Sequence, residues 1–368
     1  MTIEDIALTL QPGLGHKGVI HLMSVYGSAE AVFAASAQEI VERCGLRPDI
    51  AAALAKKEFH KTAEKEMKLL RQNGLDAVAA TDADYPPMLL HCNDYPHVLY
   101  FRGDVRVLAS RTVSMVGTRT ISQYGMRMSN VMVGQLAECV NDAVIVSGLA
   151  FGVDEHCHRA ALEYGLRTVA VLPCALPSVT PPQNARLAEQ IVADGGALIS
   201  ELNSQTRQNG NYYLPRNRII AGVSEGTLVV ESPREGGSLY TAEYAYGYER
   251  VVMALPGRVG DRCSEGTNRL IRDRKAVMVC SGRDVARELG WDIERIGVIP
   301  AKVDDKPLLS ADEERLVKCF GEGEELNVSV LAMRSGMSVG EVNALLLGLE
   351  IGGVVRSLPG KMYELAGN

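Results

Sequence analysis

The sequence has 368 residues, of which 46% are hydrophobic and 23% charged, and its formal net charge is −7. This length predicts two or three domains, and no run of about 18 apolar residues is present to span a membrane. The acidic balance excludes a generally basic surface but not a local basic pocket for nucleic acid. MTIEDIALTL lacks the basic segment of a secretory signal, and the eight scattered cysteines form no C-x-x-C pair. We therefore expect a cytoplasmic protein with reduced thiols, no metal site and no cofactor.

Residues 1–76 have a helical pattern. Apolar residues recur at three- and four-residue spacing in IEDIALTL, VIHLMSVY and AEKEMKLL, and the turn Gly13-Leu14-Gly15 interrupts them. A Gly-x-Gly turn between short helices is typical of helix-hairpin-helix or SAM-like modules that approach DNA phosphates. A plain helical bundle with glycine caps explains the pattern equally well, so both interpretations stay open.

Residues 77–291 alternate between apolar runs and helical stretches. The runs expected to form strands are residues 112–116, 143–147, 168–172, 197–200, 227–231, 251–255 and 276–280. Such near-continuous apolar runs are typical of strands that are buried on both faces. The alternation predicts an α/β domain with a Rossmann-like, doubly wound parallel sheet and right-handed crossovers.

A linker and a small domain are expected to follow. Residues 292–309 contain two prolines and mixed charges, which is typical of a linker. Residues 310–368 begin with a capping-box pattern at Ser310 and Glu313, continue with two helical runs, and end in a β-hairpin expected to turn at Pro359-Gly360. Three helices followed by a hairpin predict a winged-helix-like domain.

The first strand of the central domain ends in Gly117-Thr118-Arg119. In an open parallel sheet, ligands bind beyond the carboxyl ends of strands, where the helix expected near Ser122 offers N–H groups to an anion. Gly117 lets the backbone approach a ligand, and the Arg119 guanidinium suits phosphate, although it could pair with a carboxylate instead. We predict a phosphate contact here.

The second strand ends in Ser147-Gly148 and leads through Phe151 to Asp154. This turn lacks the G-x-G-x-x-G spacing and the acidic residue of a dinucleotide site. Asp154 could cap the next helix, and it lies four residues from His158. A structural Asp154–His158 contact is expected in preference to metal binding.

The segment NYYLPRNRIIAG, residues 211–222, carries the strongest local signal. Tyr213 precedes Arg216-Asn217-Arg218 at the start of a predicted helix. Cations that follow a backbone and rings that stack on bases are the chemistry of single-strand binding. The alternative is an ion pair of Arg216 or Arg218 with Glu201 or Glu231 at the neighbouring strand ends. Both interpretations could hold together, with one arginine buried and one free.

A third glycine turn, Gly236-Gly237-Ser238, precedes a helix and offers a backbone nest for anions. Each turn is a weak signal alone, but together they predict a phosphate-binding edge of the sheet. Tyr240, Tyr244 and Tyr248 share one helical face, for which we expect packing or a dimer contact.

These residues, in this order, resemble the DNA-processing A (DprA/Smf) family. The motifs that carry the resemblance are VGTRTISQYG, VSGLAFGVDEHCHRAAL, TVAVLP, ALISE, RNRIIAGVSEGTLVVES, GGSLYTAEYA, ALPG and EGTNRLI. They span the central domain, and the helical module before it and the winged-helix-like module after it match the family's layout.

The resemblance implies a dimeric protein that is not an enzyme. It would bind and protect incoming single-stranded DNA, help displace single-stranded-DNA-binding protein and load RecA recombinase in natural transformation. Arg167 stands where the family often has a basic contact. The expected DNA-binding residues are Gly117, Thr118, Arg119, Ser147, Gly148, Phe151, Arg167, Arg186, Tyr213, Arg216, Asn217, Arg218, Gly237 and Ser238. Phe151 departs from the family pattern, because many members have a basic residue there, but its ring could stack on a base.

Two other functions compete with this interpretation. Gly236-Gly237-Ser238 with Thr241-Ala242-Glu243 partly matches the P-G-G-x-G-T-x-x-E pattern of nucleoside-monophosphate phosphoribohydrolases, in which Glu243 would act as an acid. The second glycine pair of that pattern is missing, and those enzymes lack the flanking modules. A duplex reader is disfavoured because the presumed recognition helix, SVGEVNALLLGLEIGG, has no Arg or Lys, so we expect a protein contact or a regulatory role for that domain.

Overall fold

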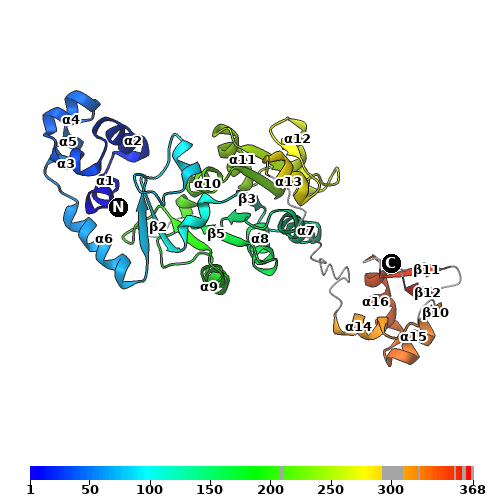
Figure 1. Cartoon of the computed structure of the whole chain (residues 1–368). Coiled ribbons are helices and arrows are strands. Elements are labelled where there is room, and N and C mark those ends of the chain that lie inside the picture. Colours follow the sequence, from blue (N-terminus) through cyan, green and yellow to red (C-terminus); the bar gives the residue numbers. More distant parts are fainter. Residues whose placement is uncertain (207–209, 292–309, 322–323, 352–353, 359–361, 366–368) are drawn as a thin grey trace. The chain divides into compact units, whose positions relative to one another are not determined.

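The computed structural model describes residues 1–206, 210–291, 310–321, 324–351, 354–358 and 362–365 (Figure 1). The chain divides into two compact units, Met1–Ile299 and Pro300–Asn368. The first unit contains both the helical module and the central sheet, so the expected boundary at residue 76 lies inside it. The linker expected at 292–309 lies outside the described residues.

The helical module confirms the pattern expected for the first 76 residues. Its helices are α1 (Ile3–Thr9), α2 (Gly15–Tyr26), α3 (Ala29–Ala34), α4 (Ala37–Cys44), α5 (Pro48–Ala55) and α6 (His60–Gln72). Apolar side chains such as Ile6, Leu22 and Ile40 form its core. The α1–α2 turn has positive φ at Gly13 and Gly15, which only glycine adopts readily, and this fits either interpretation of the module.

The central sheet has nine strands in the order β1-β2-β6-β5-β4-β3-β7-β8-β9. The strands are β1 (Asp76–Ala79), β2 (Val98–Gly103), β3 (Thr112–Gly117), β4 (Val144–Ser147), β5 (Arg167–Val171), β6 (Ala197–Ser200), β7 (Gly226–Glu231), β8 (Val251–Ala254) and β9 (Val277–Met278). From β6 to β9 the pairing is parallel, while β1 and β2 add an antiparallel edge. Six of the seven expected strands are confirmed as buried strands. The run expected at 276–280 forms only the two-residue β9, whose residues are exposed because it lies at the edge of the sheet, and β1 and β2 are additional.

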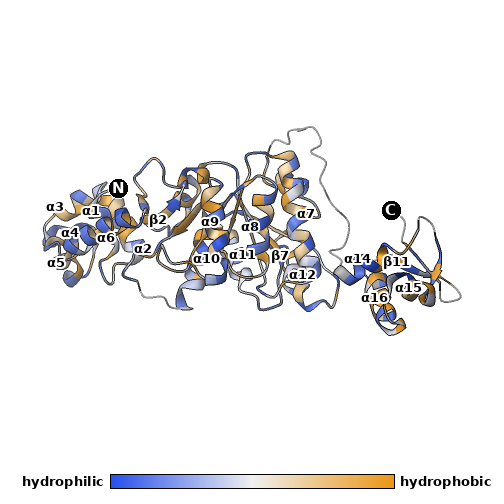
Figure 2. Ribbon diagram, turned by 90° about the horizontal axis from the view of Figure 1, so that it is seen from below, coloured by the Kyte–Doolittle hydropathy of each residue, from blue (hydrophilic) through white to orange (hydrophobic). Residues whose placement is uncertain are grey.

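Helices cover both faces of the sheet, as a doubly wound fold requires. They are α7 (Gln123–Cys139), α8 (Val153–Glu163), α9 (Ala185–Ala193), α10 (Tyr213–Gly222), α11 (Ser238–Gly247), α12 (Glu265–Arg272) and α13 (Gly282–Glu288). Alternate strand residues serve opposite faces: Val116 packs in the cluster with residues of α10 and α11, and Met115 in the cluster with residues of α7 and α8. Figure 2 shows orange, hydrophobic residues along the central strands, whereas the helices carry both orange and blue, hydrophilic residues.

Short 3₁₀ helices occupy several connections: η1 (Pro87–His91), η2 (Val105–Ala109), η3 (Pro182–Asn184), η4 (Gly210–Tyr212) and η5 (Arg262–Ser264). Among the described helices, none is both long and apolar enough to span a bilayer.

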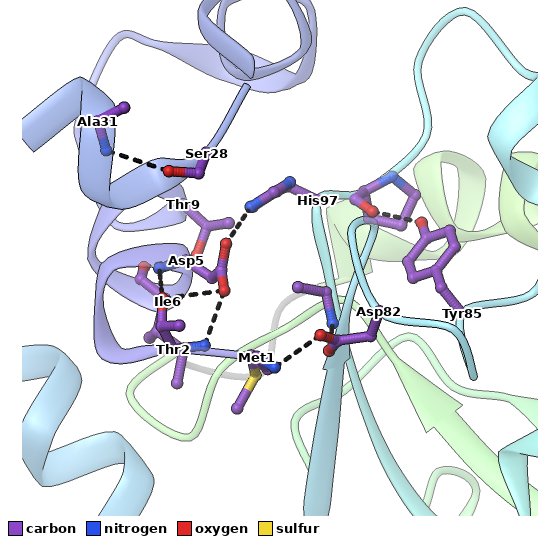
Figure 3. A network of polar contacts seen from close by, with 12 residues as sticks. Met1, Thr2, Asp5, Ile6, Thr9, Ser28, Ala31, Asp82, Tyr85 and His97 are labelled. Atoms are coloured by element: carbon purple, nitrogen blue, oxygen red, sulfur yellow. Dashed lines mark hydrogen bonds and ion pairs between the residues drawn. The ribbon is translucent and has the colours of Figure 1, made fainter. Parts of the chain in front are cut away.

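The helical module is joined to the edge of the sheet by buried polar contacts (Figure 3). The Asp5 carboxylate lies 2.8 Å from His97 Nε2, and both residues are buried. Burial raises the pKa of Asp5, but the bonds to His97 and Thr2 outweigh it and hold the pKa below its usual value. On another helix, the Glu66 carboxylate accepts hydrogen bonds from the backbone and hydroxyl of Ser204. These contacts make the module and the sheet one body.

The second unit contains α14 (Ala311–Val317), β10 (Leu326–Asn327), α15 (Val328–Ser335), α16 (Val339–Ile351), β11 (Val355–Leu358) and β12 (Met362–Leu365). The expected capping box at Ser310 and Glu313 begins α14. β11 and β12 pair as an antiparallel hairpin, and β10 adds a third strand. This is the expected winged-helix-like order, while the turn expected at Pro359-Gly360 lies outside the described residues.

Candidate functional site

The sheet changes winding direction between β3 and β7. From β3 the chain passes to β4, β5 and β6 on one side, and β7, β8 and β9 lie on the other. Ligands of doubly wound folds bind beyond the carboxyl ends of strands at such a switch point. We use the name rim for the residues there: 117–122, 148–152, 184–186, 213–217 and 236–238.

The rim contains an arginine that lies over a tyrosine ring. Arg119, in the β3–α7 loop, is exposed, and its guanidinium carbon lies 4.8 Å from the centre of the Tyr213 ring at the start of α10. Within the described part of the chain, Arg119 has no ion pair with a carboxylate. Contact with the ring uses the face of the guanidinium and not its N–H groups, which can still donate to an anion, so this pair offers both a phosphate contact and an aromatic face.

Most glycines of the rim have a different role from the one we expected. A Cβ at Gly117 would collide with Val153, and one at Gly148 would lie 2.6 Å from the Arg216 guanidinium. Gly152, with φ of +78°, would collide with the carbonyl of Thr118. These glycines are required because the rim loops pack on one another, and their Cβ positions are not open to a ligand. Gly237 differs, because nothing lies within 4 Å of its Cβ position.

Arg216 is buried beneath the rim. Its side chain donates to the carbonyls of Gly148 (2.8 Å) and Val171, at the ends of β4 and β5. Burial lowers its pKa to about 10, against the opposing effect of the Asp154 carboxylate, so it stays charged at neutral pH. A side chain held in this way positions the rim loops, and a direct phosphate contact would require it to leave them.

Arg218 is also buried, so the two interpretations are not combined here through one buried and one free arginine. It pairs with Glu201, the carboxylate named in the alternative interpretation, and one of its terminal nitrogens lies 2.9 Å from Nε2 of His16 in the helical module. Glu231 instead accepts hydrogen bonds from the backbone and hydroxyl of Ser122, the N-cap of α7. Burial and the charge of Arg218 lower the pKa of His16 to about 4, so this histidine is neutral at pH 7.

Asp154 and His158 do not form the contact expected from their spacing. The Asp154 carboxylate accepts from the N–H groups of Gly148 and Ala150, and the N-cap of α8 is Gly152. Burial raises the pKa of Asp154, against the effect of Arg216.

His158 Nδ1 lies 2.7 Å from Thr168 Oγ1. Since the Thr168 hydroxyl donates to Ile145 O, it must accept from Nδ1–H, which leaves Nε2 unprotonated. Burial and Arg216 lower the pKa of His158 to about 3.

The other expected contacts lie at different depths. Phe151 is 42% exposed in the β4–α8 loop, and Arg186 is exposed at the start of α9, next to Asn184, which donates to Leu149 O. Ser147 is buried and donates to Met115 O. Arg167 begins β5 and pairs with Val144 at the start of β4. It therefore lies at the amino ends of the parallel strands, opposite the carboxyl ends where the rim lies.

Three more expected residues complete the rim. Thr118 is held by its backbone, which donates to Glu231 O and accepts from Val153 N–H. Asn217 donates to Gly237 O at 3.4 Å, which connects α10 with α11. Ser238 is buried and bonded to Ser232, so the exposed part of the α11 start is Gly237.

The tyrosine face of α11 is divided between packing and solvent. Tyr244 and Tyr248 stack with ring centres 6.2 Å apart and pack against the core, as expected, whereas Tyr240 is 50% exposed. Glu243, the acid of the enzyme alternative, is exposed on α11 beside a shallow pocket that Tyr246 and Lys275 also line.

A doubly wound sheet with an arginine–tyrosine pair at its switch point, a helical module before it and a winged-helix-like unit after it defines a Rossmann-like binding protein without a dinucleotide fingerprint. The family model for DNA recombination-mediator protein A matches residues 76–290, and that for the DprA winged helix domain matches residues 300–361. The chain belongs to this DNA recombination-mediator (DprA/Smf) family.

Relatives and solved structures agree with this assignment. Protein Smf of Escherichia coli (strain K12) is 35% identical over 311 residues, which are 83% of this chain and 81% of that protein. The X-ray structure of DNA processing protein A from Streptococcus pneumoniae matches with a TM-score of 0.68 and 29% identity, covering 78% of this chain and 98% of that one. A structure of the Helicobacter pylori protein, reported for its single-stranded DNA binding mode, has a TM-score of 0.52 and 27% identity, covering 58% and 95%.

Proposed function

We propose that this protein binds single-stranded DNA at the rim, protects incoming strands and loads RecA recombinase onto them during transformation or recombination. The observation that carries the proposal is the exposed Arg119 guanidinium over the Tyr213 ring at the switch point. A cation for the phosphate and a ring for the base are the two parts of a sequence-tolerant single-strand site. The Helicobacter pylori relative, reported for single-stranded DNA binding, supports the same ligand.

The rim suits a single strand better than a duplex. Phe151 and Tyr213 offer apolar faces at the surface, and stacking on such faces requires unpaired bases. Arg119 and Arg186 are exposed at two different strand ends, so a flexible backbone could follow both. Arg216 would act from beneath by holding the loops that carry these groups.

Binding is tested by fluorescence anisotropy with labelled oligothymidylate and with a duplex of equal length. We expect the intact chain to prefer the single strand. Arg119→Glu should weaken binding strongly and reduce the slope of log K against log salt by about 0.7, the value for one lost phosphate contact on a single strand. Tyr213→Ala should cost about 1–3 kcal/mol, as expected for one stacked base.

The matched control is Arg272→Glu, which makes the same charge change at an exposed arginine at the end of α12. It should leave affinity and salt slope unchanged. If Arg119→Glu binds oligothymidylate as tightly as the unaltered chain, the proposed site is misplaced.

The partners in this proposal are RecA, single-stranded-DNA-binding protein and a second copy of the chain, in the cytoplasm. A dimer would suit the β9 edge of the sheet, where Val277 and Met278 are 43% and 54% exposed. RecA filament formation on strands coated with single-stranded-DNA-binding protein tests loading. Light scattering of Val277→Lys tests the dimer, and an unchanged mass would exclude this edge.

A further inference from the structure

We propose that the β8–α12 loop, residues 255–264, is an outer part of the same DNA-binding surface, in which Arg258 and Arg262 hold phosphates beyond the one held by Arg119. This inference rests on the proposed function, because it extends the rim site to a longer strand. Nothing in the fold requires either arginine: both are exposed, and neither forms an ion pair with any described residue.

The loop is held at its start. The Tyr124 hydroxyl donates to Pro256 O at 2.6 Å. The Asn268 side chain accepts from Gly257 N–H (3.1 Å) and donates to Gly257 O (3.0 Å). Side-chain bonds from two helices therefore fix the position at which the loop leaves β8. A surface that is fixed before binding loses less conformational entropy when a strand binds.

After these anchors the chain forms a tight, exposed turn. Asp261 N–H donates to Arg258 O at 3.2 Å, and Gly260 has a φ of +95°, a conformation that favours glycine. Val259 at the tip is fully exposed, with 101% of its reference surface accessible. Packing does not explain the arginine on either side of this tip, so both cations are accessible to a ligand.

The turn adjoins the rim. Cys263, the residue after Arg262, has its sulfur 4.0 Å from the carbonyl oxygen of Thr120, the residue after Arg119. In the sheet, β8 is two strands from β3, which corresponds to about 10 Å at the usual strand spacing. A strand that passes Arg119 toward β7 and β8 therefore reaches the loop, whereas a very short strand does not.

Two carboxylates oppose the arginines. Asp261 lies within the turn and Glu265 begins α12, and both are exposed. The Asp261 side chain makes no capping bond to the short helix that follows it. Its carboxylate therefore only reduces the local attraction for phosphate, and replacing it should strengthen binding to a long strand. An increase in affinity is expected only if the loop contacts phosphates, because a loop that does not contact DNA would be insensitive to the charge at Asp261.

The test compares a short oligomer, the thymidine dinucleotide pTpT, with a long oligothymidylate of about 20 nucleotides. The two phosphates of the dinucleotide lie closer together than the roughly 10 Å between β3 and β8, whereas the long oligomer exceeds a site of about 4–16 nucleotides. Arg258→Ala/Arg262→Ala should bind the short oligomer like the unaltered chain. It should bind the long one about tenfold more weakly, with a salt slope smaller by about 1.4, that is, about 0.7 for each of two contacts. Asp261→Asn should bind only the long oligomer more tightly.

The matched control is Arg272→Ala/Lys275→Ala, which removes two cations from the other end of α12 and should change neither affinity. Unchanged urea midpoints would show that every variant is folded. The inference is overturned if the double loop variant binds the long oligomer normally, or weakens both oligomers equally, or if Asp261→Asn has no effect. Failure of the proposed function is a separate result, because Arg119→Glu would then leave short-oligomer binding intact.

Discussion

Replacing Arg216 with methionine separates the support of the rim from its surface. Methionine keeps most of the length of the side chain but removes the guanidinium group. That group donates hydrogen bonds to two carbonyls, and its charge interacts with the buried Asp154 carboxylate. Arg216 and Asp154 are buried and interact electrostatically without a direct ion pair among the described contacts. Removing one of two such charges leaves the other uncompensated, which costs about 3–5 kcal/mol for a buried pair. Arg216→Met should therefore lower the free energy of unfolding by about that amount.

Urea unfolding followed by tryptophan fluorescence measures this loss. Trp291 is the single tryptophan of the chain, and it is buried in the core of the first unit. With an m-value of about 3 kcal/mol per molar urea, the midpoint should fall by about 1–2 M. The loss should shrink at acidic pH, because a protonated Asp154 needs no counter-ion.

The control for this experiment is Arg119→Met, which removes an exposed arginine of the same rim. It should change stability by no more than about 0.5 kcal/mol and yet weaken DNA binding. An Arg216→Met variant with the midpoint of the unaltered chain would refute the assignment of Arg216 as an internal support.

Three further outcomes are expected. The pKa of His158 is lowered from 6.5 to about 3, so the native state binds fewer protons than the unfolded chain between these values and stability is lost as pH falls below 6.5. Between pH 7 and pH 5 the free energy of unfolding should fall by about 2 kcal/mol for this reason. The urea midpoint of His158→Gln should not show this part of the pH dependence. Arg186→Glu should weaken single-strand binding in anisotropy titrations, whereas Arg167→Glu, at the other edge of the sheet, should not; the opposite pattern would place the DNA elsewhere. No free base should be released from nucleoside monophosphates, and turnover that Glu243→Gln abolishes would establish the enzyme alternative.

The fold was predictable where burial leaves a pattern. Strands such as Val144–Ser147 are buried on both faces and appear as continuous apolar runs, so the doubly wound parallel sheet follows from the sequence. The antiparallel edge strands were not predicted. Asp76–Ala79 begins with an exposed aspartate, and Val98–Gly103 ends in half-buried and exposed residues, so neither gives a long apolar run.

The position of the site was predictable, but the burial of its side chains was not. Glycine turns and arginines at strand ends indicate the correct edge of the sheet for Arg119, but the sequence does not tell which arginine points outward. Arg216 and Arg218 are two residues apart at the start of one helix, and both are buried because carbonyls and a carboxylate from distant strands surround them. Such partners are set by tertiary structure, which local patterns do not contain.

Two groups of residues had weaker signals. Arg258 and Arg262 flank a glycine-containing turn after a predicted strand, so the strand-end rule that selected Arg119 also applies to them. The contact of His16 with Arg218 joins residues about 200 positions apart, and no sequence pattern connects them.

The junction between α1, α6 and the sheet has a practical consequence for protein engineering. Cutting the chain near residue 76 would leave His97 without its carboxylate partner and Ser204 without the two bonds that Glu66 accepts. The smallest piece that retains a complete interior therefore starts at the first helix and continues through Trp291. Fragments designed for crystallisation, and chimaeras that exchange the leading helices between relatives, have to carry both sides of this junction together.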